Sequence, residues 1–418
     1  MRLSPPTGRE RVDLDEVDLI DPRLYGEGDA HPVWRVMRER APVRWQDAGP
    51  GLGFWSVTSW ADVSRVLRDH TAFTSEHGTL LNLLGKGDPA GGRQIAATDP
   101  PRHAAMRAPV QRALSVRSMD RQRDLIRVEV RRLLATVPDG EPFDLAEVTG
   151  ALPMAVTGTL MGLDRSDWGP LTLLTNRSVA PDDPDYTLPE GGAATLRRAH
   201  RELFAYFQNV VDGHRDDEGE DLISTLRGMV LDDGRRLSTG EIVANCYSLL
   251  LGANVTTPHV PNAALIELMG TGGYAEWAEG GPGVLATGLE EALRWSSPAN
   301  HFMRHATADL DLGGRRIRRG EAVVAWLGSA NRDEAVFADP FRFDVHRRPN
   351  RHIAFGVGPH YCLGHSVARV SLEVFLTELF AEFEDIEPAG TPEHLWSNFV
   401  VGVKRLPVVA RRRAPGGR

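Results

Sequence analysis

A glycine-rich loop that ends in a cysteine is the feature that most limits what this chain can fold into. Residues 355–364 read Phe-Gly-Val-Gly-Pro-His-Tyr-Cys-Leu-Gly, and a helical run with apolar residues on one side follows them. Cys362 is therefore expected just before a helix N-terminus, where unpaired N–H groups and the helix dipole stabilise a thiolate. Gly356, Gly358 and Gly364 allow the backbone to turn tightly and to approach a flat ligand. This pattern predicts a ligand site, whereas a lone cysteine is usually a buried structural residue.

Helical periodicity dominates the middle of the chain. One apolar stripe at helical spacing comprises Leu196, His200, Leu203, Phe204, Phe207, Val210 and Val211. Ser238 and Glu241 form a capping-box pair, and the helix that they begin could run to Met269. Pro258 and Pro261 interrupt this helix, so a distortion is expected near residues 254–257. The chain is therefore predicted to be helix-rich, with one helix long enough to cross a domain.

Short strands are predicted outside the helical part. Residues 42–46 and 53–60 alternate apolar and polar side chains, which is typical of a small sheet. Gly313 and Gly314 separate two further strand-like pieces and fit a two-residue hairpin turn. Residues 331–361 contain three prolines and no sustained period. An irregular stretch of this kind in a compact domain is more often functional than idle.

Composition narrows the class of protein. Hydrophobic residues make up 41% of the chain, and the formal net charge of -9 gives nucleic-acid binding no support. Residues 1–23 lack the apolar stretch of a secretory signal, which favours a cytoplasmic protein. The charge-free stretch 242–266 is interpreted as a buried helix, not a membrane span, because asparagine, threonine, histidine and proline interrupt it. Cys246 is interpreted as a core residue, and the ends, residues 1–20 and 411–418, are expected to be flexible.

The cysteine loop resembles that of a known family. Phe355, Gly358, Cys362 and Gly364 match the pattern Phe-x-x-Gly-x-x-x-Cys-x-Gly of the cytochrome P450 family, and the resemblance extends over almost the whole chain. It implies a mainly α fold with a small β region, folded as a single triangular helical domain over residues 1–418 with a long central oxygen-binding helix. It also implies that Cys362 is the axial ligand of the iron of haem b, where a thiolate favours O–O cleavage, and that Phe355 covers the sulfur side.

Basic residues match the family's contacts to the haem propionates. They are His103, Arg107, Arg304 and His360. His103 and Arg107 lie four residues apart, so both can point the same way from one helix. Propionates are anionic, and an arginine can hold a carboxylate through two hydrogen bonds. By resemblance, these four side chains are expected to bind the cofactor.

Glu291 and Arg294 lie three residues apart and can share one helix face. Alone, such a pair is usually solvated, but apolar neighbours favour burial here, where an ion pair needs further partners. In the family, a downstream arginine completes this pair, and Arg342 in Asp-Pro-Phe-Arg-Phe matches it. The resemblance therefore implies that these three residues brace the cysteine loop.

The predicted long helix departs from the family at one position. Residues 250–257 align with the family's oxygen-binding stretch, and Thr256 matches its threonine, but Val255 replaces the usual acid. Oxygen activation needs protons, which valine cannot relay. Thr256, Thr257, Asn254 and ordered water could form another path, or the substrate could donate or position the proton. Alternatively, the enzyme performs coupling, cyclisation or nitration in place of hydroxylation. If Thr256 takes part, Thr256→Ala should raise peroxide release, and Val255→Asp should leave the enzyme active.

The resemblance also predicts a substrate pocket. Its expected lining residues are Leu80, Leu81, Leu251, Val255, Asn300, Phe302 and Phe399. They are mostly apolar with a few hydrogen-bonding groups, which suits a medium-sized, partly polar natural product better than a bare fatty acid. We therefore expect a monooxygenase-type oxidoreductase that uses dioxygen to oxidise an intermediate of secondary metabolism, with no part for nucleic acid or membrane.

Electrons are expected from another protein, because the sequence shows no flavin or nicotinamide domain. The resemblance implies a ferredoxin-type partner with its reductase. Arg347, Arg348 and Arg351 could offer a basic patch to an acidic iron–sulfur protein, and a merely solvated charged loop is the equal alternative. The rival classes are a non-catalytic haem sensor and a helical scaffold without cofactor. Thr256 favours oxygen chemistry over sensing, since a gas sensor needs no proton delivery.

Overall fold

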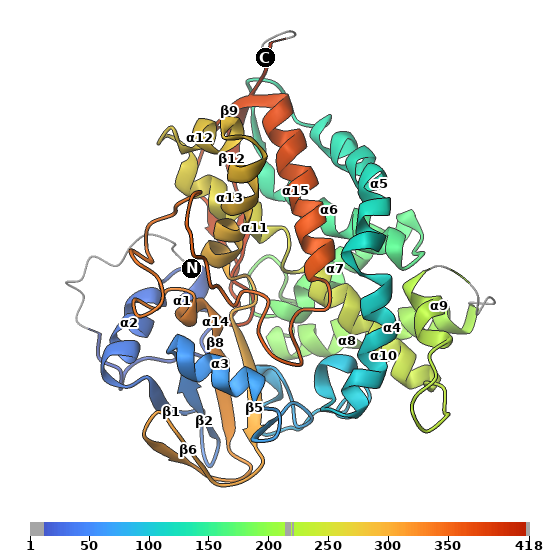
Figure 1. Cartoon of the computed structure of the whole chain (residues 1–418), viewed down its shortest axis with the longest axis vertical. Coiled ribbons are helices and arrows are strands. Elements are labelled where there is room, and N and C mark those ends of the chain that lie inside the picture. The colour runs from blue at the N-terminus through green and yellow to red at the C-terminus, as the bar shows by residue number, and fades with distance from the viewer. Residues whose placement is uncertain (1–11, 214–218, 220, 415–418) are drawn as a thin grey trace.

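Helices fill most of the molecule, and the largest sheet lies at one corner, at the lower left of Figure 1. The computed structural model describes residues 12–213, 219 and 221–414. The longer helices are α2 (His31–Arg40), α3 (Trp60–Arg68), α4 (Arg102–Ala113), α5 (Val116–Leu134), α6 (Leu145–Leu160), α7 (Trp168–Val179), α8 (Gly192–Gly213), α10 (Thr239–Asn254), α11 (His259–Leu268), α13 (Gly281–Ser296) and α15 (His365–Glu382). The shorter ones are α1 (Arg23–Gly26), α9 (Leu222–Arg227), α12 (Gly273–Glu279) and α14 (Leu327–Ala330).

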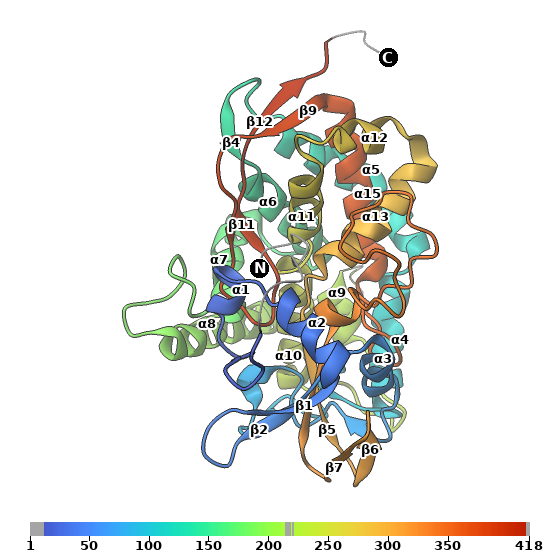
Figure 2. The same cartoon turned by 90° about the vertical axis from the view of Figure 1, so that its left-hand side faces the viewer.

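The strands described form four small sheets. The largest has the order β1 (Val43–Asp47), β2 (Gly53–Val57), β8 (Ala322–Trp326), β5 (His301–Ala306), β3 (Phe73–Thr74), with β2 and β8 parallel. The others pair β4 (Pro142–Asp144), β12 (Pro407–Arg412) and β9 (Phe383–Pro388); β10 (Glu393–His394) and β11 (Val403–Arg405); and β6 (Leu310–Leu312) and β7 (Arg315–Ile317). Figure 2 shows β9 and β12 at the end of the molecule opposite β1 and β2. Gly313 and Gly314 have φ of 52° and 74°, which confirms the predicted hairpin turn.

α10 and α11 form the interrupted central helix. The Ser238 hydroxyl accepts from the backbone N–H of Glu241, and the Glu241 carboxylate accepts from the backbone N–H of Ser238, as the capping box predicts. α10 ends at Asn254, and α11 starts after Pro258, because proline has no N–H to continue the ladder. The predicted distortion is confirmed, and it divides the expected single helix in two. Among the described residues, no helix has the length and apolar character needed to cross a membrane.

The main hydrophobic core lies among α5, α6, α10, α11, α13 and α15. Cys246 is fully buried there, as interpreted from the sequence. The apolar stripe of α8 divides between two environments. Leu203 and Phe207 enter the core, whereas His200 and Phe204 line a cavity, and Phe204 is 37% exposed. The mainly α fold with a small β region is therefore confirmed.

Both ends of the described chain are more ordered than expected. Leu19 is fully buried, and Arg411 and Arg412 pair with β9 as part of β12. Arg412 also donates to the Val137 carbonyl at 2.8 Å. The expectation of flexible ends is wrong for these residues, because backbone pairing and burial hold them. Residues 1–11 and 415–418, the rest of the predicted flexible ends, lie outside the described residues.

Candidate active site

Cys362 lies directly before α15, as the sequence predicts. Its backbone N–H donates to the Phe355 carbonyl at 2.8 Å, and α15 begins after Gly364. Burial raises the pKa of the Cys362 thiol, although the backbone N–H of Gly364 and the charge of Arg107 act against burial. The helix N-terminus alone therefore does not produce the expected thiolate. A metal cation on the sulfur would deprotonate it.

Three glycines shape this loop in different ways. Gly356 and Gly358 have φ of 68° and 79°, a conformation that favours glycine. A Cβ at Gly358 would lie 2.7 Å from the Cα of Arg68, so this glycine allows the loop to pack on α3. Around Gly364, no atom lies within 4 Å of the position that a Cβ would take. Gly364 thus leaves room for a flat ligand, whereas Gly358 serves packing within the chain.

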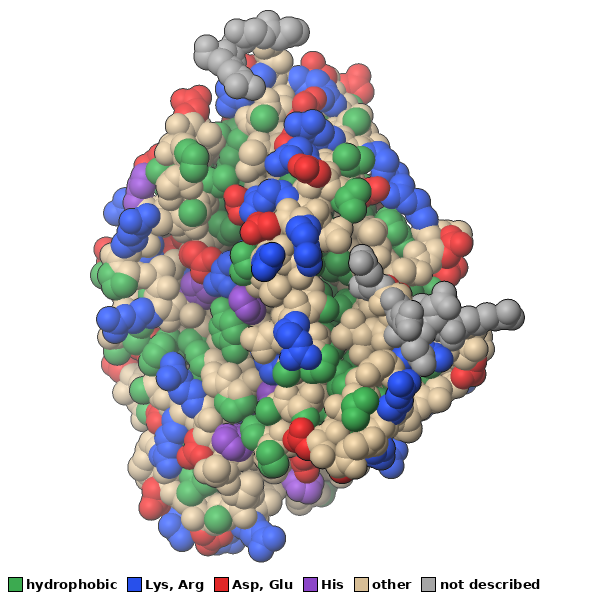
Figure 3. Space-filling model, turned by 45° about the vertical axis from the view of Figure 1, so that its right-hand side comes forward, with side chains coloured by type: hydrophobic (Ala, Val, Ile, Leu, Met, Phe, Trp, Pro, Cys, Tyr) green, Lys and Arg blue, Asp and Glu red, His purple; other side chains and the backbone are tan. Residues whose placement is uncertain are grey.

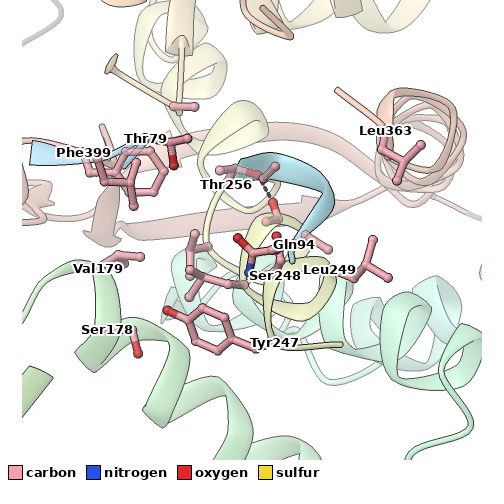
Figure 4. Close-up of a pocket in the computed structure, with 18 of the residues that line it drawn as sticks. Thr79, Gln94, Ser178, Val179, Tyr247, Ser248, Leu249, Thr256, Leu363 and Phe399 are labelled. Carbon is pink, nitrogen blue, oxygen red and sulfur yellow. Dashed lines mark hydrogen bonds between the residues drawn. The ribbon is translucent and has the colours of Figure 1, made fainter. Parts of the chain in front are cut away.

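A cavity of about 1280 Å³ extends from the cysteine loop to α10, α7 and α8. Cys362, Leu363 and Val367 line it on the side of the loop, and α10 lines it over more than three turns. Figure 4 shows Thr256, Leu249, Thr79 and Phe399 around the same space. Pockets for drug-sized ligands usually measure about 300–1,000 Å³. This cavity therefore has room for a cofactor together with a substrate.

Arg304 of β5 is a buried cation in the wall of this cavity. It is 3% exposed, and its Nη1 donates to the neighbouring Met303 carbonyl at 2.8 Å. Burial lowers the pKa of Arg304 to about 10, although Asp99 acts in the opposite direction. Among the described residues, no carboxylate forms an ion pair with it. A buried guanidinium in this state calls for an anionic partner.

The other three predicted propionate contacts differ in position. Arg107 lines the cavity, and its Nη2 donates to the Tyr361 carbonyl at 2.5 Å. His360 also lines the cavity, but its Nε2 atom lies 3.1 Å from the Ser75 hydroxyl and 3.9 Å from the Asp99 carboxylate. His103 is buried behind His360, with ring centroids 4.3 Å apart, and is not part of the cavity wall. A direct contact from His103 to a ligand in the cavity, as expected from the sequence, therefore has no geometric support.

These residues fit the haem that the resemblance implies. Cys362 lines the cavity, Gly364 leaves open space next to its own Cα, and Arg107 and Arg304 supply positive charge in the wall. A flat ligand with a cationic centre and anionic edge groups matches this set, because each buried charge then gains an opposite charge. The fit rests on the unpaired Arg304 above all.

The Glu291–Arg294 pair is buried, as predicted, but its third member is Arg347. Arg294 donates to both carboxylate oxygens of Glu291 at 2.7 and 2.8 Å, and both side chains are fully buried. Arg347 donates from Nε to the same two oxygens at 3.1 Å. The side chain of Arg342 is exposed. Its backbone carbonyl accepts from Arg347 at 2.8 Å. The assignment of Arg342 is wrong, because only at residue 347 does the irregular segment turn an arginine toward Glu291.

A second charge pair braces the cysteine loop and was not predicted. Arg369 of α15 donates to both oxygens of Glu290 at 2.6 and 2.9 Å, and His352 lies 2.8 Å from the same carboxylate. The guanidinium of Arg369 lies 4.6 Å from the centre of the Phe355 ring, in cation–π contact. Arg369 of α15 thus holds the ring of Phe355 in place at the start of the cysteine loop. The signal for this pair in the sequence is weak, since charges on a helix are usually solvated.

The polar residues near the helix distortion do not all face the cavity. Thr256 lines it, and its hydroxyl donates to the Gly252 carbonyl at 2.8 Å, the dashed line in Figure 4. Thr257 also lines the cavity. Asn254 is turned away, because its Nδ2 donates to Thr175 of α7 at 2.7 Å. The assignment of Asn254 to a proton path is therefore wrong. Val255 is 1% exposed and belongs to a small apolar cluster.

Most of the predicted substrate residues line the cavity. They are Leu80, Leu81, Leu251, Val255, Phe302 and Phe399. Asn300 is an exception: it is fully buried and donates to the Asn398 carbonyl at 2.9 Å, outside the lining. Its neighbour His301 lines the cavity instead. The assignment of Asn300 was wrong, because its side chain is held by the backbone of Asn398 and not directed to the cavity.

Comparison with known sequences connects this geometry to characterised proteins. Residues 284–407 match the family model described as Cytochrome P450. Cytochrome P450 NovI of Streptomyces niveus is 33% identical over 399 residues, which cover 95% of this chain and 97% of that protein. Linalool 8-monooxygenase of Pseudomonas putida is 32% identical over 407 residues, which cover 95% and 99%. The similarity therefore spans nearly the full length of both relatives.

Solved structures share the fold as well. P450 OxyD, described as involved in the biosynthesis of vancomycin-type antibiotics, superimposes with a TM-score of 0.83 at 35% identity and covers 95% of this chain and 100% of its own. A Mycobacterium marinum cytochrome P450 in complex with pseudoionone gives a TM-score of 0.86 at 30% identity, with coverage of 96% and 100%. Both span the irregular segment, the cysteine loop and the central helix of this chain.

Proposed function

The chain belongs to the cytochrome P450 family of haem-dependent monooxygenases, and we propose that it holds haem b on Cys362 and oxidises a small organic molecule of secondary metabolism. One observation carries this proposal. Cys362, Thr256 and Arg304 all line one cavity, and among the described residues no carboxylate forms an ion pair with Arg304.

The residues of the chain divide the work between them. Cys362 would bind the iron, while Arg107, Arg304 and His360 would hold the propionates. Bound in this way, haem would supply the activation of dioxygen. Glu291, Arg294 and Arg347 fix the segment that precedes the cysteine loop, and Arg369 fixes Phe355.

Thr256 is the group that we assign to proton delivery. Its hydroxyl donates to the Gly252 carbonyl, so one of its lone pairs remains open to water or substrate in the cavity. Thr257 is the second hydroxyl at this point of the wall. With Val255 apolar and Asn254 turned away, water bound by these two threonines takes the place of the usual acid.

The substrate class follows from the cavity and is consistent with the relatives. The wall combines leucine and phenylalanine side chains with scattered hydroxyl and amide groups, which suits a partly polar natural product. The relatives act, by name, on linalool or on a steroid, or take part in antibiotic biosynthesis. We assign the protein to the biosynthesis of a secondary metabolite, in the cytoplasm.

A second candidate, oxidation without oxygen insertion, has its own support. Val255 and the orientation of Asn254 leave the cavity poor in proton-relaying groups near Thr256, and coupling or cyclisation would not need hydroxylation. Turnover under isotopically labelled dioxygen separates the two, since only hydroxylation places the label in the product.

Electrons would come from a ferredoxin-type protein and its reductase. On the face shown in Figure 3, Lys and Arg side chains are interspersed with Asp and Glu, so local charges must guide such a partner. Arg348 and Arg351 are exposed next to the cysteine loop, whereas Arg347 is occupied by Glu291. The basic patch is therefore reduced to two arginines.

The test of this proposal is spectroscopic. The purified haem-loaded protein should show the red-shifted absorption of a thiolate-bound carbon monoxide complex after reduction, and Cys362→Ser should lose it. Cys246→Ser is the matched control, because Cys246 lies in the core. Turnover of candidate intermediates with a surrogate electron donor then tests catalysis against sensing. A wild-type protein without the red shift would refute the ligand assignment.

A further inference from the structure

A group of uncharged polar side chains lines the cavity along the middle of α10 and the segments that face it. We define it as the distal polar cluster, made up of Gln94, Ser178, His200, Tyr247 and Ser248. Figure 4 shows the Tyr247 hydroxyl directed toward Ser178, and Gln94 beside Ser248. These residues come from four segments, since α7 carries Ser178 and α8 carries His200. None of them was singled out as a polar site by the sequence.

Tyr247 is the centre of this cluster. Its hydroxyl lies 3.0 Å from Nε2 of His200, and the two rings meet edge to face with centroids 5.5 Å apart. The Phe204 ring lies 5.0 Å from the Tyr247 ring on the other side. A hydroxyl has one donor and two acceptor positions, so the contacts with His200 and Ser178 leave one position for a ligand. The aromatic rings offer apolar faces next to it.

The cluster carries no formal charge. Burial lowers the pKa of His200 and raises the pKa of Tyr247, so both are neutral at neutral pH. Of the charged residues in the lining near the cluster, Arg93 and Asp182 are exposed, and the Asp88 carboxylate accepts from the backbone N–H of Ala90 at 2.8 Å. Glu241 is paired with Arg102 and Arg235 at 2.5 and 2.7 Å. An anionic ligand group would lose its water here, and the nearby Asp88 carboxylate would repel it.

We propose that the distal polar cluster is a substrate subsite that binds a neutral hydroxyl group on a ring, such as a phenol. This assignment rests on the proposed function, because it makes the cluster the anchor of the molecule that is oxidised. Tyr247 precedes Thr256 by nine residues, which corresponds to about 13 Å along a helix axis. The substrate is therefore elongated, with its hydroxylated ring held by Tyr247 and its far end placed near Thr256.

The experiment compares two probes in the haem-loaded full chain, 4-phenylphenol and biphenyl, which differ only by the hydroxyl. Binding is measured by calorimetry and by the shift of the haem absorption. Tyr247→Phe should weaken 4-phenylphenol about 3- to 10-fold, the effect of one uncharged hydrogen bond, and should leave biphenyl unchanged. Tyr206→Phe is the matched control, since Tyr206 bonds Asp167 outside the cavity and should change neither affinity.

Ser178→Ala is the second variant and should act in the same direction as Tyr247→Phe. Equal weakening of both probes, or no change for 4-phenylphenol in both variants, would overturn the subsite. Tighter binding of 4-phenylbenzoate than of 4-phenylphenol would overturn its neutral character. The carbon monoxide spectrum of each variant separates the two proposals, because a failed subsite leaves the thiolate signature intact, whereas a missing signature in the wild type refutes the function itself.

Discussion

Arg347 donates from Nε to both carboxylate oxygens of Glu291 at 3.1 Å, from a position 56 residues farther along the chain. Glu291 also accepts from Arg294 and from the backbone N–H of Asp344. Burial would raise the pKa of Glu291, but the bonds from Arg294 and the charge of Arg347 keep it low. The carboxylate thus joins α13 to the irregular segment that leads into the cysteine loop.

Replacing Arg347 should cost far more stability than replacing Arg342. Arg347→Leu leaves the buried Glu291 charge with one partner fewer, which we expect to lower the free energy of unfolding by about 3–5 kcal/mol. Arg342→Leu changes an exposed side chain and should have little effect. Urea unfolding followed by circular dichroism measures both, and equal losses in the two variants would contradict the assignment.

Arg304→Met should have opposite effects on the two forms of the protein. Without haem, the variant loses an unpaired buried charge and should gain about 1–3 kcal/mol of stability. With haem, it loses a charged hydrogen bond, so cofactor affinity should fall about 10- to 100-fold. Calorimetric unfolding of both forms and haem transfer to a competing globin report these changes. A variant that retains haem as well as the wild type would disprove the role of Arg304.

Thr256→Ala should raise the release of hydrogen peroxide at the expense of product, because the cavity then loses the hydroxyl that we assign to proton delivery. Asn254→Ala is the comparison, since Asn254 bonds Thr175 and should leave the product yield per electron unchanged. Parallel assays of product and peroxide decide between them. If Asn254→Ala uncouples the enzyme and Thr256→Ala does not, the proton path has been assigned to the wrong residue.

Glu241 should make the protein sensitive to acid. Burial would raise its pKa, but hydrogen bonds from Arg235 and Ser238 outweigh burial and lower the pKa to about 2. Because the pKa of Glu241 is lower in the folded state, its ionised form stabilises the fold at pH values above its ordinary pKa. This stabilisation is lost as the pH falls from about 5 toward 2. Glu241→Gln should therefore cost about 2 kcal/mol at pH 7 and flatten the decline of stability below pH 5. Exposed Glu147→Gln is the control in unfolding curves from pH 2 to 7.

Reversing the charges of Arg348 and Arg351 should slow reduction by an acidic ferredoxin-type protein. Both side chains are exposed before the cysteine loop, so the double change to glutamate should lower the rate about 10-fold at low salt, with the difference shrinking at high salt. Stopped-flow reduction measures this rate. The same reversal at Arg315 and Arg318, at the β6–β7 hairpin, should have no effect. An unchanged reduction rate after reversal of Arg348 and Arg351 would show that these two arginines belong to the solvated surface and not to a docking site.

Short stretches of sequence are enough to predict the local features of this protein. Ser238 and Glu241 cap the central helix, Pro258 divides it, and Cys362 precedes α15, because each depends on a few neighbouring residues. The family pattern then identified the fold and the cavity residues Thr256 and Phe399. These predictions hold because capping, proline geometry and loop spacing do not depend on distant contacts.

Which distant side chains meet depends on how the helices and strands pack together. The choice of Arg347 over Arg342 depends on the path of a segment without periodicity, and the exclusion of Asn300 from the cavity depends on its hydrogen bond to the distant Asn398. The turn of Asn254 toward Thr175 depends on how α7 packs on α10. In each case neighbouring residues of similar chemistry compete for one position, and only the packing of separate elements selects between them.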